Sequence, residues 1–226
     1  MTVVATVGTT HPLAFAGLVF AALALADDGI RPVCVVAGVS AQGATNVIAR
    51  SAVDAATIRA QFAALRDAGV QAFHVGALVS AESVHAVAEG LDAFAGIPVV
   101  VDPVLASTGG DALADDATAA ALRDALIPRA TLVTPNLDEA SALLGIAVAD
   151  VASMHQAAQA LTELGARAAL VKGGHLAGDA VDVLAGEHGA HEFRSPRVTG
   201  TLRGTGDLLA VTIAGCLARG ASLTEA

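Results

Sequence analysis

The chain has 226 residues and a mass of 22.2 kDa, which suits one domain, because a single core grows to about 250 residues before chains usually divide. Apolar residues make up 54% of the chain and charged residues 15%, a balance that excludes an intrinsically disordered protein. The net charge is −10, the basic residues are spread singly, and there is no Tyr or Trp, so we expect no nucleic-acid partner. We predict a single domain over residues 1–226.

The high apolar content raises the question of a membrane segment. The apolar stretch 13–26 has 14 residues and ends at Asp27, short of the roughly 18 to 20 residues that a spanning helix needs. The first three residues carry no basic side chain, unlike a secretory signal. We therefore expect a cytoplasmic protein with no membrane partner, in which Cys34 and Cys216 are small core side chains.

Short β-branched runs alternate along the chain with longer stretches rich in Ala and Leu, a pattern typical of βαβ units around a parallel sheet. The runs predict strands at 3–7, 33–37, 72–75, 99–101, 131–133 and 168–171. The stretches between them predict helices at 14–26, 57–68, 80–94, 117–126, 137–144 and 154–164. We predict an α/β fold with a doubly wound, mainly parallel sheet sandwiched by helices.

The pattern changes after Lys172, where turns alternate with short polar runs. These runs predict short antiparallel strands within 179–184, 187–193 and 196–199. A last helix is predicted from Asp207 to about Ala218, with Gly220 as its stop. The chain shows no linker and no internal repeat, which supports the single domain.

Four polar motifs follow predicted strands or precede the last helix. They are DPV at 102–104, TPNLDE at 134–139, KGGH at 172–175 and GTGD at 204–207. In open α/β sheets ligands bind beyond the carboxyl ends of the strands. These motifs are therefore the candidates for a functional site.

The GTGD motif suits an anion. Gly204 and Gly206 let the backbone turn tightly, and the following helix offers unpaired N–H groups at its positive end. Asp207, in the first turn, is placed to take a proton from a hydroxyl that attacks a phosphoryl group. The motif alone equally fits a glycine-rich loop with an acidic residue that starts a helix.

Four further side chains suit phosphate and metal chemistry. Lys172 is the only lysine and closes an apolar strand, where its ammonium can reach a nucleotide phosphate or extend to the surface. Asn136 and Glu139 match a capping box, and Glu139 also suits Mg²⁺ coordination through water. Asp102 ends a very hydrophobic strand, where a carboxylate must reach water or pair with a cation, so we expect a role linked to a metal.

Three longer segments surround these motifs: VVVDPVLASTGGD at 99–111, IPRATLVTPNLDEASALLG at 127–145 and LVKGGHLAGDAVDVL at 170–184. In this order and at these spacings they resemble the ribokinase-like superfamily of small-molecule kinases, and most of all the hydroxymethylpyrimidine/phosphomethylpyrimidine kinases of thiamine synthesis. The resemblance covers residues 95–220 through specific motifs and the first 95 residues only weakly.

The resemblance implies a homodimeric phosphotransferase that uses ATP and Mg²⁺ to phosphorylate the hydroxymethyl group of a small heteroaromatic ring. It implies catalysis by Asp207 with an anion hole formed by Gly204, Thr205 and Gly206. The other implied roles are nucleotide binding by Thr134, Asn136, Lys172 and Gly173, metal binding by Asp102 and Glu139, and substrate binding by Gly8, Gln42, Ala77 and Val104.

Departures from the family concern the substrate. The pyrimidine kinases usually carry Cys where this chain has Asp207, and GTGD is also the motif of pyridoxal kinases. The family's N-terminal segment AGSDPSGGAGIQAD reads VGTTHPLAFAGLVFA at 7–21, with Ala21 in place of its acidic residue. Gln42 keeps the family's pocket glutamine, whereas Ala77 stands where Met is usual. Two alternatives are therefore open: a pyridoxal kinase, and a non-catalytic ligand-binding relative with a changed pocket.

Overall fold

The computed structural model describes residues 1–43, 46–107, 109–174, 176, 178–187, 189–198 and 203–226. Within these residues the strands form one nine-stranded sheet in the order β3-β2-β1-β4-β5-β6-β7-β8-β9. The strands are β1 (Val3–Thr10), β2 (Arg31–Gln42), β3 (Val47–Ala52), β4 (Ala72–Val75), β5 (Val99–Val101), β6 (Leu132–Val133), β7 (Ala168–Lys172), β8 (Ala180–Gly186) and β9 (Gly189–Ser195). The neighbours from β2 to β7 pair in parallel, and β3, β8 and β9 pair antiparallel.

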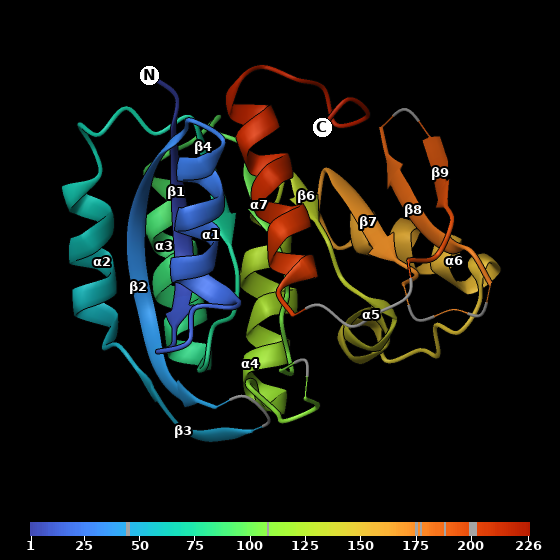
Figure 1. Ribbon diagram of the computed structural model, residues 1–226, viewed down its shortest axis with the longest axis horizontal. Helices are drawn as coiled ribbons and strands as arrows, with labels where there is room; N and C mark the ends of the chain where they lie inside the picture. The colour runs from blue at the N-terminus through green and yellow to red at the C-terminus, as the bar shows by residue number, and fades with distance from the viewer. Residues whose placement is uncertain (44–45, 108, 175, 177, 188, 199–202) are drawn as a thin grey trace.

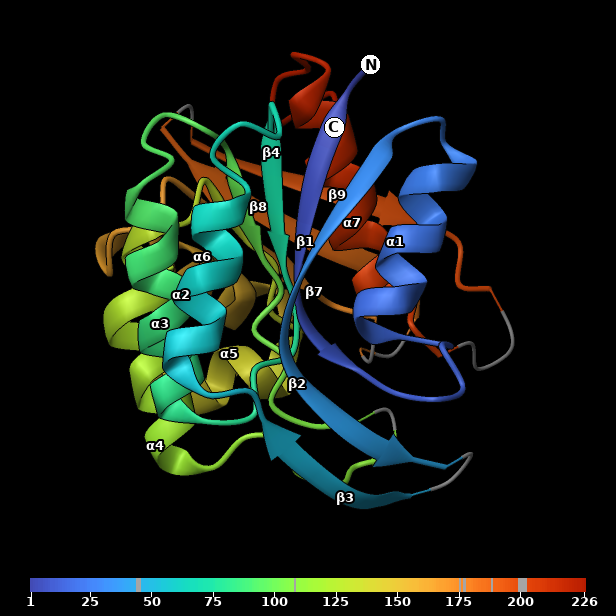
Figure 2. The ribbon, with the colours of Figure 1, turned by 90° about the vertical axis from the view of Figure 1, so that its left-hand side faces the viewer.

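Helices cover both faces of the sheet (Figures 1 and 2). One face carries α1 (Gly17–Asp27) and α7 (Thr205–Ala218), and the other carries α2 (Ala55–Ala64), α3 (Ala81–Asp92), α4 (Asp116–Ala121), α5 (Leu137–Leu144) and α6 (Val151–Glu163). Successive strand residues point to opposite faces, so Val99 and Val101 join the core under α2 to α6, while Val100 joins the core under α1 and α7. The predicted doubly wound, mainly parallel sheet is confirmed.

Some local predictions need correction. The strand β3 was not predicted, because its residues are exposed or half-buried and show no buried alternating face. Cys34 is exposed on β2, so its assignment to the core is wrong, and Cys216 is only partly buried. Residues 196–198 form no strand, and Thr199, the end of that predicted segment, lies outside the described residues.

The order of connections places a crevice near the middle of the sheet. The chain leaves β1 through α1 on one face to reach β2, whereas α2 on the other face leads to β4, the second neighbour of β1. At such a switch point the helices diverge from the carboxyl ends of the strands and leave room for a ligand. The helix α7 packs across β1, β4 and β5 on the face that it shares with α1.

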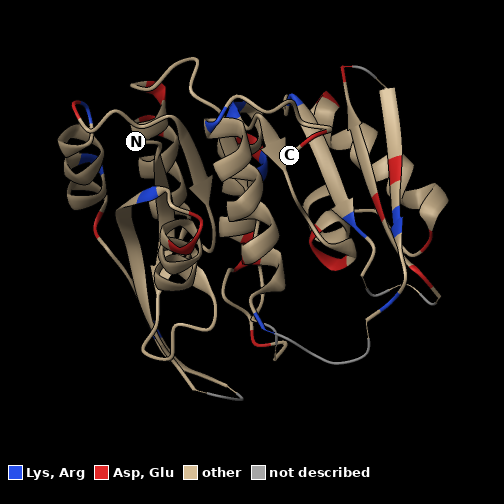
Figure 3. Ribbon diagram, turned by 45° about the horizontal axis from the view of Figure 1, so that its top comes forward, with Lys and Arg blue, Asp and Glu red and all other residues tan. Residues whose placement is uncertain are grey.

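The basic side chains are distributed over the fold in the part of the chain that is described. Figure 3 shows Lys and Arg scattered over several elements, with no gathering on one of them. Among the described residues, no helix is both long and apolar enough to cross a membrane.

Candidate active site

A buried ion pair lies at the carboxyl edge of the sheet. Nζ of Lys172, the last residue of β7, lies 2.8 Å from Oδ1 of Asp102, the residue after β5. Thr134, after β6, donates its hydroxyl to the same oxygen at 3.0 Å. The side chains are only 14% exposed for Lys172 and 3% for Asp102. Because β5, β6 and β7 are neighbours, three motifs that are distant in the sequence meet at this point.

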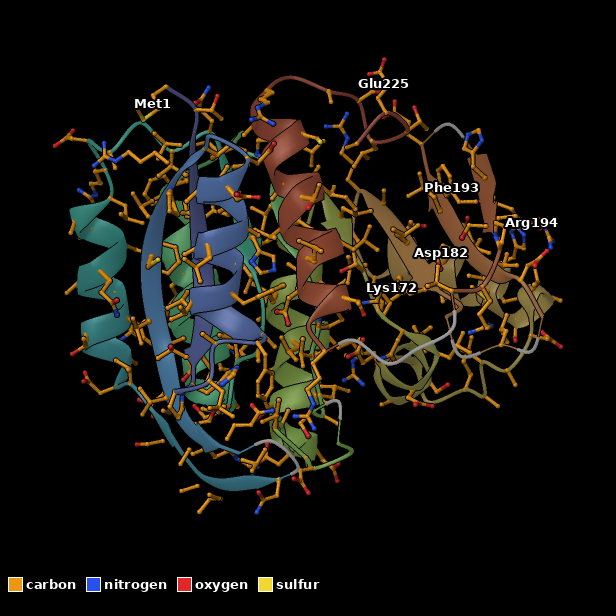
Figure 4. The ribbon with its side chains drawn as sticks, in the orientation of Figure 1. Met1, Lys172, Asp182, Phe193, Arg194 and Glu225 are labelled. Carbon is orange, nitrogen blue, oxygen red and sulfur yellow. The ribbon has the colours of Figure 1, made fainter. Side chains whose placement is uncertain are left out.

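The first turn of α7 rests directly on this ion pair. Gly204 has a left-handed backbone with φ of 77°, and a Cβ added there would lie 2.4 Å from the carbonyl oxygen of Phe15. A Cβ added at Gly206 would lie 3.1 Å from Nζ of Lys172 and 3.5 Å from Oδ2 of Asp102. Among the described residues, no side chain caps this helix start, so its first N–H groups can hold an anion. Figure 4 shows Lys172 beside this end of α7.

Asp207 follows in the same turn and carries an unusually basic carboxylate. Its side chain is half-buried and lines a pocket that is described below. Burial is the main cause that raises the pKa of Asp207 to about 6, and the negative charge of Asp102 adds to the effect. The backbone of Gly17 and the ammonium of Lys172 oppose it. Asp207 is thus largely ionised at neutral pH and is a better proton acceptor than an ordinary aspartate.

Asn136 and Glu139 form the predicted capping box at the start of α5, which is confirmed. The N–H of Glu139 donates to Oδ1 of Asn136 at 2.9 Å, and the N–H of Asn136 donates to Oε2 of Glu139 at 2.8 Å. The N–H of Lys172 donates to the carbonyl of Pro135 at 2.8 Å, which ties this helix start to the end of β7. Burial and the charge of Asp102 raise the pKa of Glu139 to about 7.

The structure also explains why residue 173 is glycine. A Cβ added at Gly173 would lie 2.1 Å from the carbonyl oxygen of Val181, so the two strands pack too closely for a side chain. The N–H of Gly173 donates to Oδ1 of Asp182 at 2.9 Å, and Asp182 lies opposite Lys172 in the pairing of β7 with β8 (Figure 4). The N–H of Gly173 is therefore already used within the protein. It could bind a nucleotide phosphate only if its hydrogen bond to Asp182 were broken.

A pocket opens beside the first turn of α7. Its wall includes Gln42, Ala77 and Val104, three of the four residues that the sequence predicts at the substrate. Gly8, the fourth, lies in β1 and is not among the lining residues, whereas the next residue, Thr9, lines the pocket. The remaining lining residues are His11, Ala16, Gly17, Ser40, Ala106, Ser107, Leu113 and Asp207. The altered N-terminal segment therefore contributes Thr9, His11, Ala16 and Gly17 to the wall of this pocket.

A larger groove lies elsewhere and has no comparable chemistry. It measures about 280 Å³ against about 60 Å³ for the pocket at Asp207, and it lies between β7, β8 and the C-terminal tail. Pro98, Thr131 and Arg167, at the amino ends of the strands, line it together with leucines. No described residue of the four polar motifs lines this groove, so its size does not make it the site.

Two buried histidines at the site were not assigned from the sequence. His11 lines the pocket and is 7% exposed. His74, in β4, lies with Nδ1 3.0 Å from Oγ1 of Thr6, and burial lowers its pKa to about 4. A Cβ added at Gly76 would lie 3.5 Å from both Oδ1 of Asp207 and Cε1 of His74. Gly76 is thus next to both the carboxylate and the imidazole. A histidine within the otherwise apolar run AFHV was the signal that could have revealed His74.

The carboxylates of the site suit a hydrated cation. Asp102, Glu139 and Asp207 act on one another electrostatically, with Lys172 as the ammonium in the same field. In the described part of the chain, no three His, Cys, Asp or Glu side chains group closely enough to hold a metal by themselves. Mg²⁺ prefers oxygen ligands and keeps several waters when it binds with phosphates. The donor set therefore fits Mg²⁺ that takes most of its ligands from phosphate and water.

Phosphoryl transfer to a small alcohol needs a base, a cradle of amides and a cation at one end of a pocket. The carboxyl edge of this sheet combines Asp207, the first turn of α7 and Lys172 in that way, which places the chain in the class of ribokinase-like small-molecule kinases. The model of one family in this class, described as phosphomethylpyrimidine kinase, matches residues 17–226. The chain belongs to this family and is a phosphotransferase.

Individual relatives agree with this assignment. A hydroxymethylpyrimidine/phosphomethylpyrimidine kinase of Streptomyces coelicolor is 43% identical over 209 residues, which cover 90% of this chain and 75% of that protein. A crystal structure of phosphomethylpyrimidine kinase from Clostridium difficile superposes with a TM-score of 0.89 at 28% identity and covers 100% of this chain and 94% of that one. An ADP complex of Bacillus subtilis pyridoxal kinase gives a TM-score of 0.90 at 29% identity, with coverages of 100% and 87%. The resemblance inferred from the motifs is confirmed.

Proposed function

We propose that the protein transfers the γ-phosphoryl group of ATP to the hydroxymethyl group of hydroxymethylpyrimidine, or of its phosphate, in thiamine synthesis. The observation that carries this proposal is the position of Asp207. It lines a pocket together with Gln42, and it lies in the same helical turn as Gly206, which is next to Nζ of Lys172. The name of the Streptomyces coelicolor relative supports a pyrimidine substrate. The ADP complex of the Bacillus subtilis neighbour supports an adenine nucleotide as donor.

In the proposed reaction Asp207 accepts the proton of the substrate hydroxyl. The hydroxyl oxygen forms a bond to the γ-phosphorus of ATP as the bond from that phosphorus to the departing ADP oxygen breaks. The N–H groups of Thr205, Gly206 and Asp207, presented by the turn at Gly204, hold the charge of the migrating group. Because these donors are already in place in the folded protein, little reorganisation is needed at the moment of transfer.

We assign the nucleotide phosphates to Lys172 and Asn136. An ammonium has three N–H donors, of which the hydrogen bond to Asp102 uses one, so Lys172 can hold Asp102 and a phosphate together. Thr134 acts by orienting Asp102 through its hydroxyl, and Gly173 by permitting the close turn after β7. Bound Mg²⁺ would neutralise phosphate charge, with Asp102 and Glu139 holding it through water.

The pH dependence of the reaction follows from the carboxylates. We expect kcat/KM to fall about tenfold for each unit that the pH drops below about 6, because protonated Asp207 cannot accept the substrate proton. Initial rates with coupled ADP detection between about pH 5 and 8 measure this. The fall of kcat/KM at low pH, which is the acidic limb of the pH profile, should persist in the variant Glu139→Gln. If it disappears in that variant, the limb belongs to Glu139, whose pKa is about 7, and the role of Asp207 is not supported.

The contribution of these carboxylates to stability should change with pH in the opposite direction, which separates lost chemistry from unfolding. Asp207 and Glu139 have pKa values raised to about 6 and about 7 in the folded protein. They therefore bind protons more tightly when folded than unfolded, and their contribution to stability is full below about pH 4 and is lost as the pH rises through about 6 to 7. His74 and His11, whose pKa values burial lowers, have the opposite dependence and reduce this gain. The midpoint of thermal unfolding should thus change little between pH 7 and 5.5 while activity falls.

A substrate panel decides between the candidate activities. We expect ADP formation with hydroxymethylpyrimidine or its phosphate, and a kcat/KM at least about tenfold lower with pyridoxal, because the polar edges of the two rings differ. Coupled ADP detection measures both. Turnover of pyridoxal without turnover of the pyrimidine would make the protein a pyridoxal kinase. Thermal stabilisation by the pyrimidine without ADP formation would favour the non-catalytic relative, since a ligand that binds only the folded state raises its stability.

We also propose that residues 1–226 act as one domain and that the protein is a cytoplasmic homodimer. One sheet that runs from β3 to β9 supports the single domain. The strand β3 ends the sheet and exposes 73% of Ile48. Such an edge pairs readily with a second chain, which supports the dimer.

A further inference from the structure

The pocket wall contains one polar ring whose hydrogen-bonding capacity is not used. Nδ1 and Nε2 of His11 are both shielded from solvent and have no hydrogen-bond partner among the described residues, and the residue is 7% exposed. Unpaired buried polar atoms destabilise a folded protein, and they are rare outside sites with a function. His11 belongs to the segment 7–21, in which the chain departs from the family pattern.

Neighbouring side chains hold this ring in place and connect it to the anion cradle. The ring centroids of His11 and Phe15 lie 4.7 Å apart at 51°, and Cζ of Arg203 lies 4.8 Å from the centroid of Phe15. Arg203 directly precedes Gly204, against which the carbonyl of Phe15 packs. The stack of His11, Phe15 and Arg203 therefore links the pocket wall to the first turn of α7.

The surroundings also determine the charge of the ring. Burial is the main cause that lowers the pKa of His11, and the positive charge of Arg203 adds to it. The Ala16 backbone, which comes near the ring without forming a hydrogen bond of normal geometry, opposes them. The imidazole is thus neutral at neutral pH and offers one N–H donor and one lone-pair acceptor. An aminopyrimidine presents the matching pair, since its amino group donates and its ring nitrogens accept.

The rest of the pocket agrees with this arrangement. Ala77, Val104 and Leu113 provide apolar wall, which suits the faces of an aromatic ring. We infer that His11 is a specificity-determining residue, which hydrogen-bonds the nitrogen-bearing edge of the substrate ring while Asp207 faces the hydroxymethyl group. This inference rests on the proposed function. It explains how a pocket without the family's usual N-terminal segment still selects its substrate.

The variant His11→Phe tests the inference, because it keeps a planar ring and removes both nitrogens. We expect KM for hydroxymethylpyrimidine to rise about tenfold, the effect of one lost hydrogen bond, with KM for ATP as the internal reference. The midpoint of thermal unfolding without ligand should stay the same or rise, because two unpaired atoms are removed. A purely structural histidine would show the reverse, with lower stability and an unchanged KM for the pyrimidine. His85→Phe, at an exposed position of α3, is the matched control and should change neither quantity.

Substrate analogues locate the contact. One analogue lacks the amino group, and a second replaces the adjacent ring nitrogen by CH. We expect at least one of these replacements to lower kcat/KM of the parent enzyme about tenfold and to leave kcat/KM of His11→Phe unchanged. The reason is that the effects of removing two groups that bind each other do not add. Equal losses in both enzymes for both analogues, or an unchanged KM in His11→Phe, would overturn the inference.

Failure of the proposed function gives a different result. If the parent enzyme does not phosphorylate the pyrimidine, the function is overturned, and thermal shift with the same compound decides the role of His11. Stabilisation of the parent protein but not of His11→Phe supports the contact, whereas equal stabilisation, or none in either protein, overturns it.

Discussion

Asp207→Asn should lower kcat by about three orders of magnitude, within the 10²- to 10⁴-fold range typical of a general base, while KM for ATP stays within about threefold. The amide keeps the shape of the side chain in the first turn of α7 but cannot take the substrate proton. The amides at the helix start and the ammonium of Lys172 remain in place, so nucleotide binding should survive. Steady-state kinetics with both substrates varied measure the two quantities.

The control for this variant is Asp116→Asn. Asp116 also lies in the first turn of a helix, α4, but is exposed to solvent and lies outside the residues that line the pocket. It should leave both kinetic constants unchanged. An Asp207→Asn enzyme with normal turnover would remove Asp207 from the chemistry, and a parallel loss of ATP binding would indicate that the change had distorted the cradle.

Lys172→Met should destabilise the protein by about 3 to 5 kcal/mol, the usual effect of removing one partner from a buried ion pair. Asp102 is almost completely buried and, among the side chains that the structure describes, would keep only the hydroxyl of Thr134 as a hydrogen-bond donor. Methionine has a similar length and fills most of the volume, so the loss reflects the charge. Denaturant unfolding measures the free energy, and KM for ATP measures the nucleotide site.

A second substitution separates stability from function. In the double variant Lys172→Met with Asp102→Asn, residue 102 no longer carries an unpaired buried charge, so most of the lost stability should return, because the two residues form one interacting pair. KM for ATP should stay raised by at least about tenfold in both variants, since the ammonium is absent from both. A double variant with normal ATP binding would show that Lys172 serves only to neutralise Asp102.

The local signals in the sequence were sufficient for most elements. The strands predicted at 72–75 and 99–101 have those bounds in β4 and β5, because an apolar β-branched run between turn residues is decided by its own side chains. The capping box of Asn136 and Glu139 spans four residues and was identified for the same reason. The predicted helix stop, Gly220, lies two residues after the end of α7 at Ala218 and has a left-handed backbone with φ of 89°.

The strand β3 shows where local signals are insufficient. Its side chains are exposed or half-buried, so they carry no periodic apolar pattern, and the strand exists because the end of β2 offers free backbone groups for pairing. Such an element depends on its neighbour and cannot be read from its own residues.

The features of the candidate site also fall into those that local signals in the sequence reveal and those that they do not. Local signals identify the residues that follow the strands and start α7, since turns and helix starts have local chemistry. The folded structure is needed to see that Lys172 pairs with Asp102, 70 residues away, that the N–H of Gly173 donates to Asp182, and that His11 is enclosed in the pocket wall. These facts depend on which strands are neighbours and on how closely backbones approach. Contacts of that kind arise from packing the whole sheet, and no short segment of the chain encodes them.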